Sequence, residues 1–348
     1  MVTKVTKART GQPTLEEVAA LAGVGRGTVS RVINNSPRVK DTTRHLVEQA
    51  IAQLGYIPNR AARALAGSRT DAVALVIPET EKRFFAEPYF SDIVHGVGDA
   101  LADTDLQLLL TLVRNEKERQ RFLQYARARR IDGVLLVSVH GDDPLPDLLA
   151  GMELPTVLSG RRSGDESVSY VDSDNVGGAR AAVRHLAESG RRTIGTITGP
   201  LDMYVAQCRL RGYEEAVRAA PGAGGHGPGG PLVAHGDFTE ESGRRAMAEL
   251  LAREPDLDAV FAASDVMAVG ALHTLRSLGR RVPEDVAVVG FDDSPISRHT
   301  DPQLTTVRQP VEEMGRTMAR VLLETLNDSS AAWQHVVLRT ELVRRASG

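Results

Sequence analysis

Five polar side chains with hydrogen-bonding groups lie on one face of a short helix near the start of the chain. They are Arg26, Thr28, Ser30, Arg31 and Asn34. Their guanidinium, hydroxyl and amide groups are the donors and acceptors that meet base edges and phosphate oxygens of DNA. This face therefore indicates a nucleic-acid surface, and the alternative is an ordinary helical hairpin in a core.

The helices that position these side chains follow from the apolar pattern. The apolar positions are Leu15, Val18 and Ala19 in a first helix and Val29, Val32 and Ile33 in a second. Gly23 stands at the turn between them, where a positive φ is expected. Such a pair predicts a helix-turn-helix, whose second helix fits the DNA major groove. A third helix is expected from Asp41, acting as its cap, to Leu54, with Gly55 ending it.

Charge and composition agree with a DNA-binding head on a larger body. The 348 residues are enough for two or three domains. Residues 1–70 hold 11 Lys+Arg against 4 Asp+Glu, a net +7, whereas the remainder carries −10. Cys208 is the only cysteine, which excludes an intramolecular disulfide. The start of the chain is polar and basic without an apolar core, so we expect a cytoplasmic protein.

From Asp71 onward, buried strands alternate with helices. The expected strands of the first half are 73–77, 106–113, 133–137 and 155–158, and the expected helices are 89–103, 116–129 and 144–150. The same order restarts after Tyr170, interrupted by a Gly- and Pro-rich surface loop at 221–231. Strand and helix in regular order predict parallel sheets covered by helices on both faces. Two such lobes in tandem place a cleft between them, where ligands bind at the carboxyl ends of the strands.

The segment between head and body, Asn59 to Gly67, could form about two helical turns. Isolated helices of this length are marginal in water. We therefore expect it to fold only against a partner.

Several motifs, in order along nearly the whole chain from Pro13 to about Arg345, resemble those of the LacI/GalR family of transcription regulators. They are TLEEVA through TVSRVIN at 14–34, GYIPNRAARAL at 55–65, Gly199-Pro200, RLRGY at 209–213, ASD at 263–265, VGFDD at 289–293 and LTTV at 304–307. The resemblance implies an all-α helix-turn-helix head and an α/β core like a periplasmic binding protein, made of two parallel, doubly wound sheets. It also implies a homodimer on a palindromic operator. Some members of the family form tetramers through an extra C-terminal helix, but we find no such heptad pattern in this sequence and expect a dimer.

The domain limits implied are a flexible arm at 1–13, the DNA-binding domain at 14–58, a hinge helix and linker at 59–70, and an effector-binding and dimerisation core at 71–345. The first lobe of that core would be about 71–170 plus 311–338. The second would be about 171–310 plus 339–345.

The resemblance also assigns roles in DNA binding. Arg26, Gly27 and Arg31 take the base-reading positions, although Gly27 has no side chain to read with. Leu65 takes the position of a leucine that wedges into the minor groove at the centre of the operator; the alternative is a leucine that packs within its own domain. The remaining predicted DNA-binding residues are Thr14, Thr28, Ser30, Asn34, Arg38, Lys40, Thr43, Tyr56, Asn59 and Ala62.

In the cleft, Arg209 and Asp292 stand where the family binds its effector, and both can bond to neighbouring hydroxyls. Phe238 matches an aromatic that stacks on a flat ring. The other predicted effector residues are Ser264, Asp265, Tyr89, Phe90, Ser138 and Arg161. Without the resemblance, Asp292-Asp293 would more simply be a turn or a helix cap.

These features predict a ligand-controlled repressor of sugar uptake or catabolism genes. A small effector, a sugar or polyol before a nucleobase, would set how the two hinge segments meet on DNA. No metal-ligand spacing and no cofactor motif is present, so neither a metal nor a cofactor is expected. The alternatives are a solute-binding protein of a transporter and a sugar-acting enzyme with the same two-lobed fold.

Overall fold

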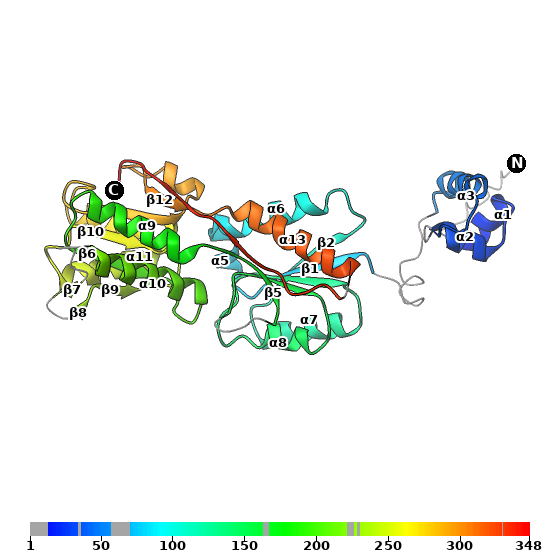
Figure 1. The fold of residues 1–348 in the computed structure, drawn as a ribbon, viewed down its shortest axis with the longest axis horizontal. Coiled ribbons are helices and arrows are strands. Elements are labelled where there is room, and N and C mark those ends of the chain that lie inside the picture. Colours follow the sequence, from blue (N-terminus) through cyan, green and yellow to red (C-terminus); the bar gives the residue numbers. More distant parts are fainter. Residues whose placement is uncertain are drawn as a thin grey trace, which may run out of the picture. The chain divides into compact units, whose positions relative to one another are not determined.

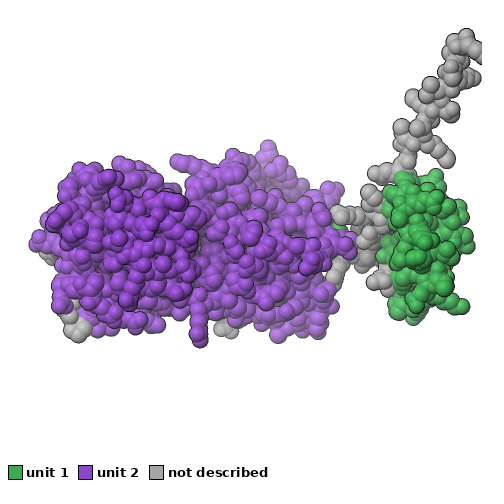
Figure 2. Space-filling model, turned by 90° about the horizontal axis from the view of Figure 1, so that it is seen from above, with its two compact units in different colours: residues 1–70 green, residues 71–348 purple. Residues whose placement is uncertain are grey.

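The computed structural model describes residues 13–33, 36–56, 70–162, 167–220, 226–227, 230–328 and 330–348. The chain divides into two compact units, residues 1–70 and 71–348, which Figure 2 colours separately.

The head, unit 1, contains three helices around a small apolar core. They are α1 (Leu15–Leu21), α2 (Arg26–Ile33) and α3 (Asp41–Leu54). Val18, Val29 and Val47, one from each helix, are fully buried together. Gly23 has φ +66° in the predicted turn, and Gly55 closes α3 in the left-handed conformation with φ +60°. One detail was wrong: α3 begins at Asp41 itself, and its cap is Lys40, which makes no side-chain capping bond.

The body contains two six-stranded sheets (Figure 1). The sheet of the first lobe has the order β13-β5-β4-β3-β1-β2, with every strand parallel to its neighbours. Its strands are β1 (Ala72–Ile77), β2 (Gln107–Leu112), β3 (Gly133–Leu136), β4 (Thr156–Ser159), β5 (Ser169–Ser173) and β13 (His335–Leu338). Its helices are α5 (Glu81–Ala86), α6 (Pro88–Leu101), α7 (Glu116–Arg127), α8 (Leu145–Ala150) and α13 (Val311–Asn327). α6 and α13 cover one face, and α7 and α8 cover the other.

The sheet of the second lobe has the order β14-β12-β11-β10-β6-β9. Its strands are β6 (Ile194–Thr198), β9 (Val233–His235), β10 (Ala259–Ala262), β11 (Ala287–Asp292), β12 (Thr305–Arg308) and β14 (Glu341–Val343). Its helices are α9 (Asn175–Glu188), α10 (Tyr204–Ala219), α11 (Glu240–Arg253), α12 (Asp265–Ser277) and the 3-10 turn η1 (Pro295–Arg298). The sheet is parallel except for β14, which runs antiparallel to β12. α11 and α12 pack on one face, and α9 and α10 pack on the other.

The chain crosses between the lobes after β5, after β12 and after β13 (Figure 1). The crossovers bring distant segments together, so that α13 packs against α6 and β13 pairs with β5. Some elements differ from expectation: the short helix α5 and the strand β5 were not predicted, and within the Gly- and Pro-rich loop, largely outside the described residues, β7 (His226–Gly227) pairs with β8 (Gly230–Pro231). In the described part of the chain, no helix is long and apolar enough to cross a membrane.

Candidate effector cleft and DNA-binding face

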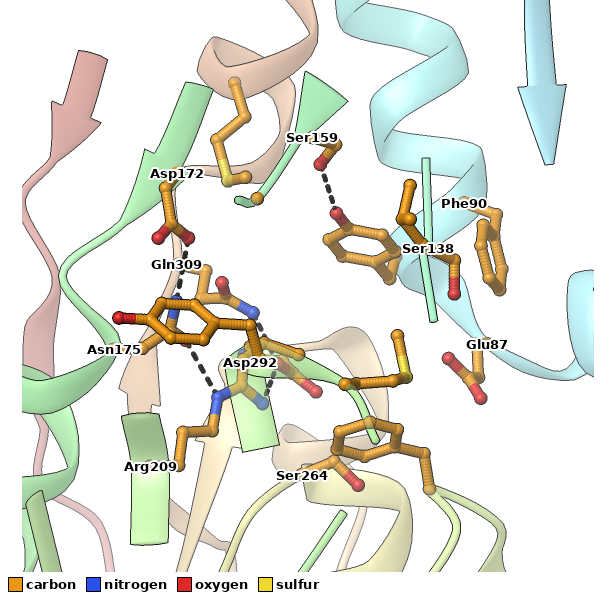
Figure 3. A pocket seen from close by; sticks show the side chains of 18 of the residues that line it. Glu87, Phe90, Ser138, Ser159, Asp172, Asn175, Arg209, Ser264, Asp292 and Gln309 are labelled. Carbon is orange, nitrogen blue, oxygen red and sulfur yellow. Dashed lines mark hydrogen bonds and ion pairs between the residues drawn. The ribbon is translucent and has the colours of Figure 1, made fainter. Parts of the chain in front are cut away.

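A cavity lies between the two lobes of the body, with an empty volume of about 980 Å³ that includes open solvent. Its walls come mainly from the carboxyl ends of strands and the segments that follow them, as a parallel sheet predicts. Eight of the predicted effector residues line it: Tyr89, Phe90, Ser138 and Arg161 from the first lobe, and Arg209, Phe238, Ser264 and Asp292 from the second. Figure 3 shows part of this lining.

Arg209, on α10, is a deeply enclosed charged side chain of the cleft, with 4% of its surface exposed. Its Nε donates to Asn175 Oδ1 at 2.9 Å, and its Nη1 donates to the Ala263 carbonyl at 2.5 Å. The guanidinium also stacks 3.8 Å from the centre of the Phe291 ring. These contacts fix the fork of Arg209 and aim it into the cleft (Figure 3).

Asp292 ends β11 and faces Arg209. Its Oδ1 lies 3.6 Å from Arg209 Nη1 and accepts a 2.7 Å hydrogen bond from Gln309 Nε2. The residue has φ +119°, a conformation that L side chains rarely adopt. Burial raises the pKa of Asp292 to about 6, because Arg209 and Gln309 offset only part of the desolvation cost. The backbone at Asp292 is thus strained and the burial of its carboxylate is only partly compensated, as is common at functional sites.

Asp265, by contrast, does not line the cavity and is completely buried behind it. It accepts hydrogen bonds from the Ser294 amide at 2.8 Å and the Ser294 hydroxyl at 3.1 Å, and a third from the Thr306 hydroxyl. Burial and the nearby charge of Asp292 both raise its pKa. The geometry therefore does not place the Asp265 carboxylate where it could contact an effector. Its hydrogen bonds instead support the loop after β11.

Aromatic side chains form the apolar part of the wall. Phe238, with φ +66°, lies against Gly199, where a Cβ would come within 2.2 Å of the ring. The Gly199-Pro200 motif thus makes room for this ring. Tyr89 bonds through its hydroxyl to Ser159 at 2.7 Å, and desolvation raises the pKa of the phenol to about 12. Rings of this kind can cover the apolar face of a sugar while charged groups bind its hydroxyls.

The hydroxyls predicted for the cleft are already engaged. Ser138 donates to Glu79 at 2.6 Å, and Ser264 caps α12 by accepting from the Met267 amide at 3.2 Å. Arg161 Nε lies 3.2 Å from Asp172 Oδ2. Ser138 and Ser264 therefore shape the wall more than they offer free groups.

Sequence reasoning missed several polar residues of the lining, among them Glu87, Asp172, Asn175 and Gln309. Asp172 lies in β5, which no expected strand included, and Asn175 and Gln309 lie at crossovers between the lobes. Asn175 Nδ2 donates to Asp172 Oδ1 at 2.9 Å, so that these residues and Arg209 form one bonded chain. An Asp in an alternating apolar stretch, at 168–172, was the signal available for the first of them.

Glu87, at the start of α6, faces Arg83 of α5. Arg83 Nε donates to its Oε1 at 2.7 Å. Burial nevertheless raises the pKa of Glu87 to about 7, because Arg83, which also bonds to Glu79 at 2.6 Å, offsets only part of the desolvation cost. Arg83 also lies 5.3 Å from the centre of the Phe238 ring and so contacts the second lobe.

Each of the three cations of the lining faces one carboxylate of the lining: Arg83 faces Glu87, Arg161 faces Asp172 and Arg209 faces Asp292. Among the described residues, no group of three or more His, Cys, Asp or Glu side chains is placed to hold a metal ion. Paired charges and aromatic walls suit recognition of an uncharged molecule with many hydroxyls.

In the head, most of the predicted DNA-binding residues that the structure describes lie on α2, in the loop that follows it, or at the starts of α1 and α3. The exposed ones are Thr14, Arg26, Gly27, Ser30, Arg31, Arg38 and Lys40, and Thr28 and Thr43 are half-buried. Thr14 is the N-cap of α1, accepting from the Glu17 amide at 3.3 Å. Arg26 pairs with Glu16 at 3.0 Å, and Arg31 Nε donates to the Gly27 carbonyl at 3.0 Å.

Tyr56 has a different place from the one expected. It is 8% exposed and belongs to the core of the head, which makes it a packing residue. Asn34, Asn59, Ala62 and Leu65 lie outside the described residues.

Comparison with known proteins gives two matches to family descriptions. Residues 14–59 match the lacI family of bacterial regulatory proteins, and residues 183–348 match a periplasmic binding protein-like domain. The transcriptional regulator CelR of Thermobifida fusca is 52% identical over 342 residues, which are 98% of this chain and 99% of CelR.

Two solved structures share the fold. A CelR–cellobiose complex has 51% identity and a TM-score of 0.77, covering 97% of this chain and 100% of the other. A lac repressor dimer bound to operator and the anti-inducer ONPF has 28% identity and a TM-score of 0.81, with 97% and 99% covered. The helix-turn-helix head, the two-sheet core and these matches together establish that the chain belongs to the LacI family of transcription regulators.

Proposed function

We propose that this regulator represses genes of sugar uptake or catabolism, and that a saccharide held between its lobes controls its grip on a palindromic operator. It acts as a homodimer in the cytoplasm. Residues 14–58 bind DNA, 59–70 form the hinge and 71–345 form the effector-binding core. The observation that carries the proposal is the pairing of three arginines with three carboxylates around a cleft with aromatic walls.

The charges of the cleft favour a neutral ligand. A ligand with its own carboxylate or phosphate would leave one charge of the cleft without a partner. An unpaired charge in a buried site costs about 3–5 kcal/mol. A neutral sugar keeps each pair intact and can add hydrogen bonds to Arg209, Asp292 and Asn175. Because CelR has been solved with cellobiose, we propose a glucose disaccharide of this kind as the effector.

The DNA side of the proposal rests on the exposed polar face of α2. Arg26 and Arg31 are the base-reading residues we propose, and Thr14, Ser30, Arg38 and Lys40 are phosphate contacts. Leu65, in the hinge, is the minor-groove wedge. A solute-binding protein or a sugar-acting enzyme would have no use for this basic head, and the relatives named above are regulators rather than enzymes.

A mobility-shift assay tests the proposal. DNA fragments from upstream of the chain's own gene and of neighbouring sugar genes are titrated with the protein, with and without cellobiose at millimolar concentration. We expect a shift of a palindromic fragment that cellobiose changes at least several-fold, as effector couplings of about 1–3 kcal/mol predict. No preference for any palindrome over random duplex, with or without sugars, would refute it.

A further inference from the structure

A cluster of titratable side chains joins the two lobes at the rim of the effector cleft. From the first lobe it contains Glu79, which follows β1, and His140, which follows β3. From the second lobe it contains Asp202, which follows β6 and precedes α10. We refer to Glu79, His140 and Asp202 as the rim cluster. None of the three lines the cavity.

His140 bonds to both lobes at once. Its Nδ1 bonds to Asp202 Oδ2, and its Nε2 lies 3.3 Å from Glu79 Oε1. A second bond across the gap runs from the Gly141 amide to the Asp202 carbonyl at 2.9 Å. The approach is close: a Cβ on Gly141 would lie 2.7 Å from that carbonyl oxygen, so only glycine allows it. The lobes therefore meet here through two adjacent residues of one loop.

The geometry requires a particular charge on His140. A neutral imidazole carries one N–H and can donate to one carboxylate, whereas an imidazolium carries two. Glu79 is 7% exposed and also accepts from the Ser138 hydroxyl and from Arg83, each at 2.6 Å. Those bonds and His140 lower the pKa of Glu79 despite its burial, and its carboxylate therefore stays ionised. Bonds to Glu79 and Asp202 in turn raise the pKa of His140 to about 9.

The rim cluster is continuous with the cavity on both sides. In the first lobe, Ser138 and Arg83 line the cavity and bond to Glu79. In the second lobe, Asp202 immediately precedes Met203 and Tyr204, which also line it. A ligand that contacts both walls and a cation that joins both rims favour the same arrangement of the lobes, so that their free energies are linked.

We propose that His140, as an imidazolium between Glu79 and Asp202, is a positioning residue that holds the lobes in the arrangement that binds the saccharide. This inference rests on the proposed function, since it concerns the same cleft. It makes saccharide affinity depend on the protonation of His140, because the saccharide binds tightly while His140 is charged. Affinity therefore falls as pH rises through the range in which His140 loses its proton.

The charged groups around His140 come from several elements. They are Glu79 after β1, Arg83 on α5, Asp202 before α10, Asp142 and Asp143 on its own loop, and Arg119 of α7, which pairs with Asp143. Glu87 and Asp292, with pKa values raised to about 7 and about 6, add their own pH dependence to binding. Only a difference between wild type and a His140 variant isolates the rim cluster.

The test compares His140→Gln, Asp202→Asn and the double variant with wild type by calorimetric titration of cellobiose from pH 6 to 9.5. The matched control is His273→Gln. His273 Nδ1 also bonds to a carboxylate, Glu240 at 2.9 Å, but both residues belong to the second lobe. At pH 7 we expect each rim variant to bind about tenfold more weakly, which corresponds to about 1.4 kcal/mol. The double variant should lose no more than either single variant.

The pH profile separates positioning from a general loss of structure. Wild-type affinity should decline more steeply than that of His140→Gln as pH rises from about 6.5, the ordinary pKa of histidine, to about 9, its raised pKa, and His273→Gln should follow wild type. Equal affinities and parallel profiles for wild type and His140→Gln would overturn the proposal. Thermal melting of each variant identifies any that fails to fold.

A readout without sugar covers the case in which wild type binds no cellobiose, which would refute the proposed effector alone. Proton–nitrogen spectra of histidine-labelled protein follow the His140 ring directly, with His140→Gln supplying the assignment. We expect Asp202→Asn to lower the pKa of His140 by about one unit or more, the size of an opposite charge at hydrogen-bond distance. An identical titration of His140 in wild type and Asp202→Asn would overturn the contact between the lobes.

Discussion

Replacing Asp292 by Asn should abolish most of the saccharide response while leaving the fold intact. The side chain keeps its shape, and its amide oxygen can still accept the hydrogen bond from Gln309 Nε2. In the wild-type protein this bond to Asp292 Oδ1 is 2.7 Å long. It loses the charge that a sugar hydroxyl would bond to. A hydrogen bond to a charged group contributes about 1.5–3 kcal/mol, so we expect affinity for cellobiose to fall by about 10- to 150-fold.

Stability should change little in this variant. The pKa of Asp292 in the folded protein, about 6, lies above its ordinary value of 3.8. Its contribution to stability is therefore complete below about pH 4 and is lost as pH rises through 6, so at pH 7.5 the side chain is ionised and its buried charge no longer favours the fold. Removing that charge costs the fold little, although Arg209 keeps only its bonds to Asn175 and the Ala263 carbonyl.

The neighbouring aspartate supplies the contrasting variant. The Asp293 side chain is 1% exposed and pairs with Arg345 Nη2 at 2.5 Å and Arg308 Nε at 2.8 Å, and it does not line the cavity. Asp293→Asn breaks a buried pair and should cost about 3–5 kcal/mol of stability with little loss of affinity in the protein that remains folded. Calorimetry and thermal melting at pH 7.5 measure both variants. Wild-type affinity in Asp292→Asn would refute this interpretation of the cleft.

Three further changes give distinct outcomes. Gly199→Ala places a Cβ 2.2 Å from Phe238 Cζ, so the displaced ring should weaken cellobiose binding in calorimetry without altering sugar-free DNA affinity; unchanged sugar binding would contradict the role of this ring. Arg31→Ala should remove about 1–3 kcal/mol of discrimination at one base pair of each half-site, and an equal loss on every sequence of an operator panel would make it a phosphate contact instead. Because the pKa of Glu87 is raised from 4.5 to about 7, its stabilising contribution is present below about pH 4.5 and is lost as pH rises through 7. At pH 8, Glu87→Gln should therefore melt at a higher temperature than wild type, with a free energy of unfolding greater by at most about 3 kcal/mol, and the two should match near pH 4.5. Equal melting temperatures at pH 8 would contradict the raised pKa.

Sequence reasoning worked best where a local pattern has one structural solution. The helix-turn-helix followed from apolar spacing and from Gly23, whose φ of +66° suits few other residues. α5 was missed because its six residues are too few for a helical period, and only its capping Thr80 marks it. The strand β5 was missed for a related reason, since it is short and holds the polar Asp172 in a fully buried run.

The residues of the cleft also differ in how well the sequence predicts them. Arg209, Phe238 and Asp292 stood in recognisable motifs, whereas Asn175 and Gln309 are brought in by crossovers, whose position depends on the order of strands in both sheets. Asp265 shows the opposite error. Its motif, ASD, lies beside the cavity, yet its carboxylate turns inward to the Ser294 amide and the Thr306 hydroxyl, a direction that spacing alone does not define.

The crossovers explain how a ligand at Asp292 could act on the angle between the lobes. Gln309 lies in the crossover after β12 and donates to Asp292 Oδ1, while its own Oε1 accepts from the Ser173 hydroxyl at 2.7 Å. Ser173 ends β5 at a second crossover. The third is tied to it as well, since the Asp174 amide donates to the Leu338 carbonyl at 2.8 Å. Gln309 therefore connects the effector site to the crossover segments about which the lobes must turn. A bond gained or lost at Asp292 would change the contacts of Gln309 with these segments.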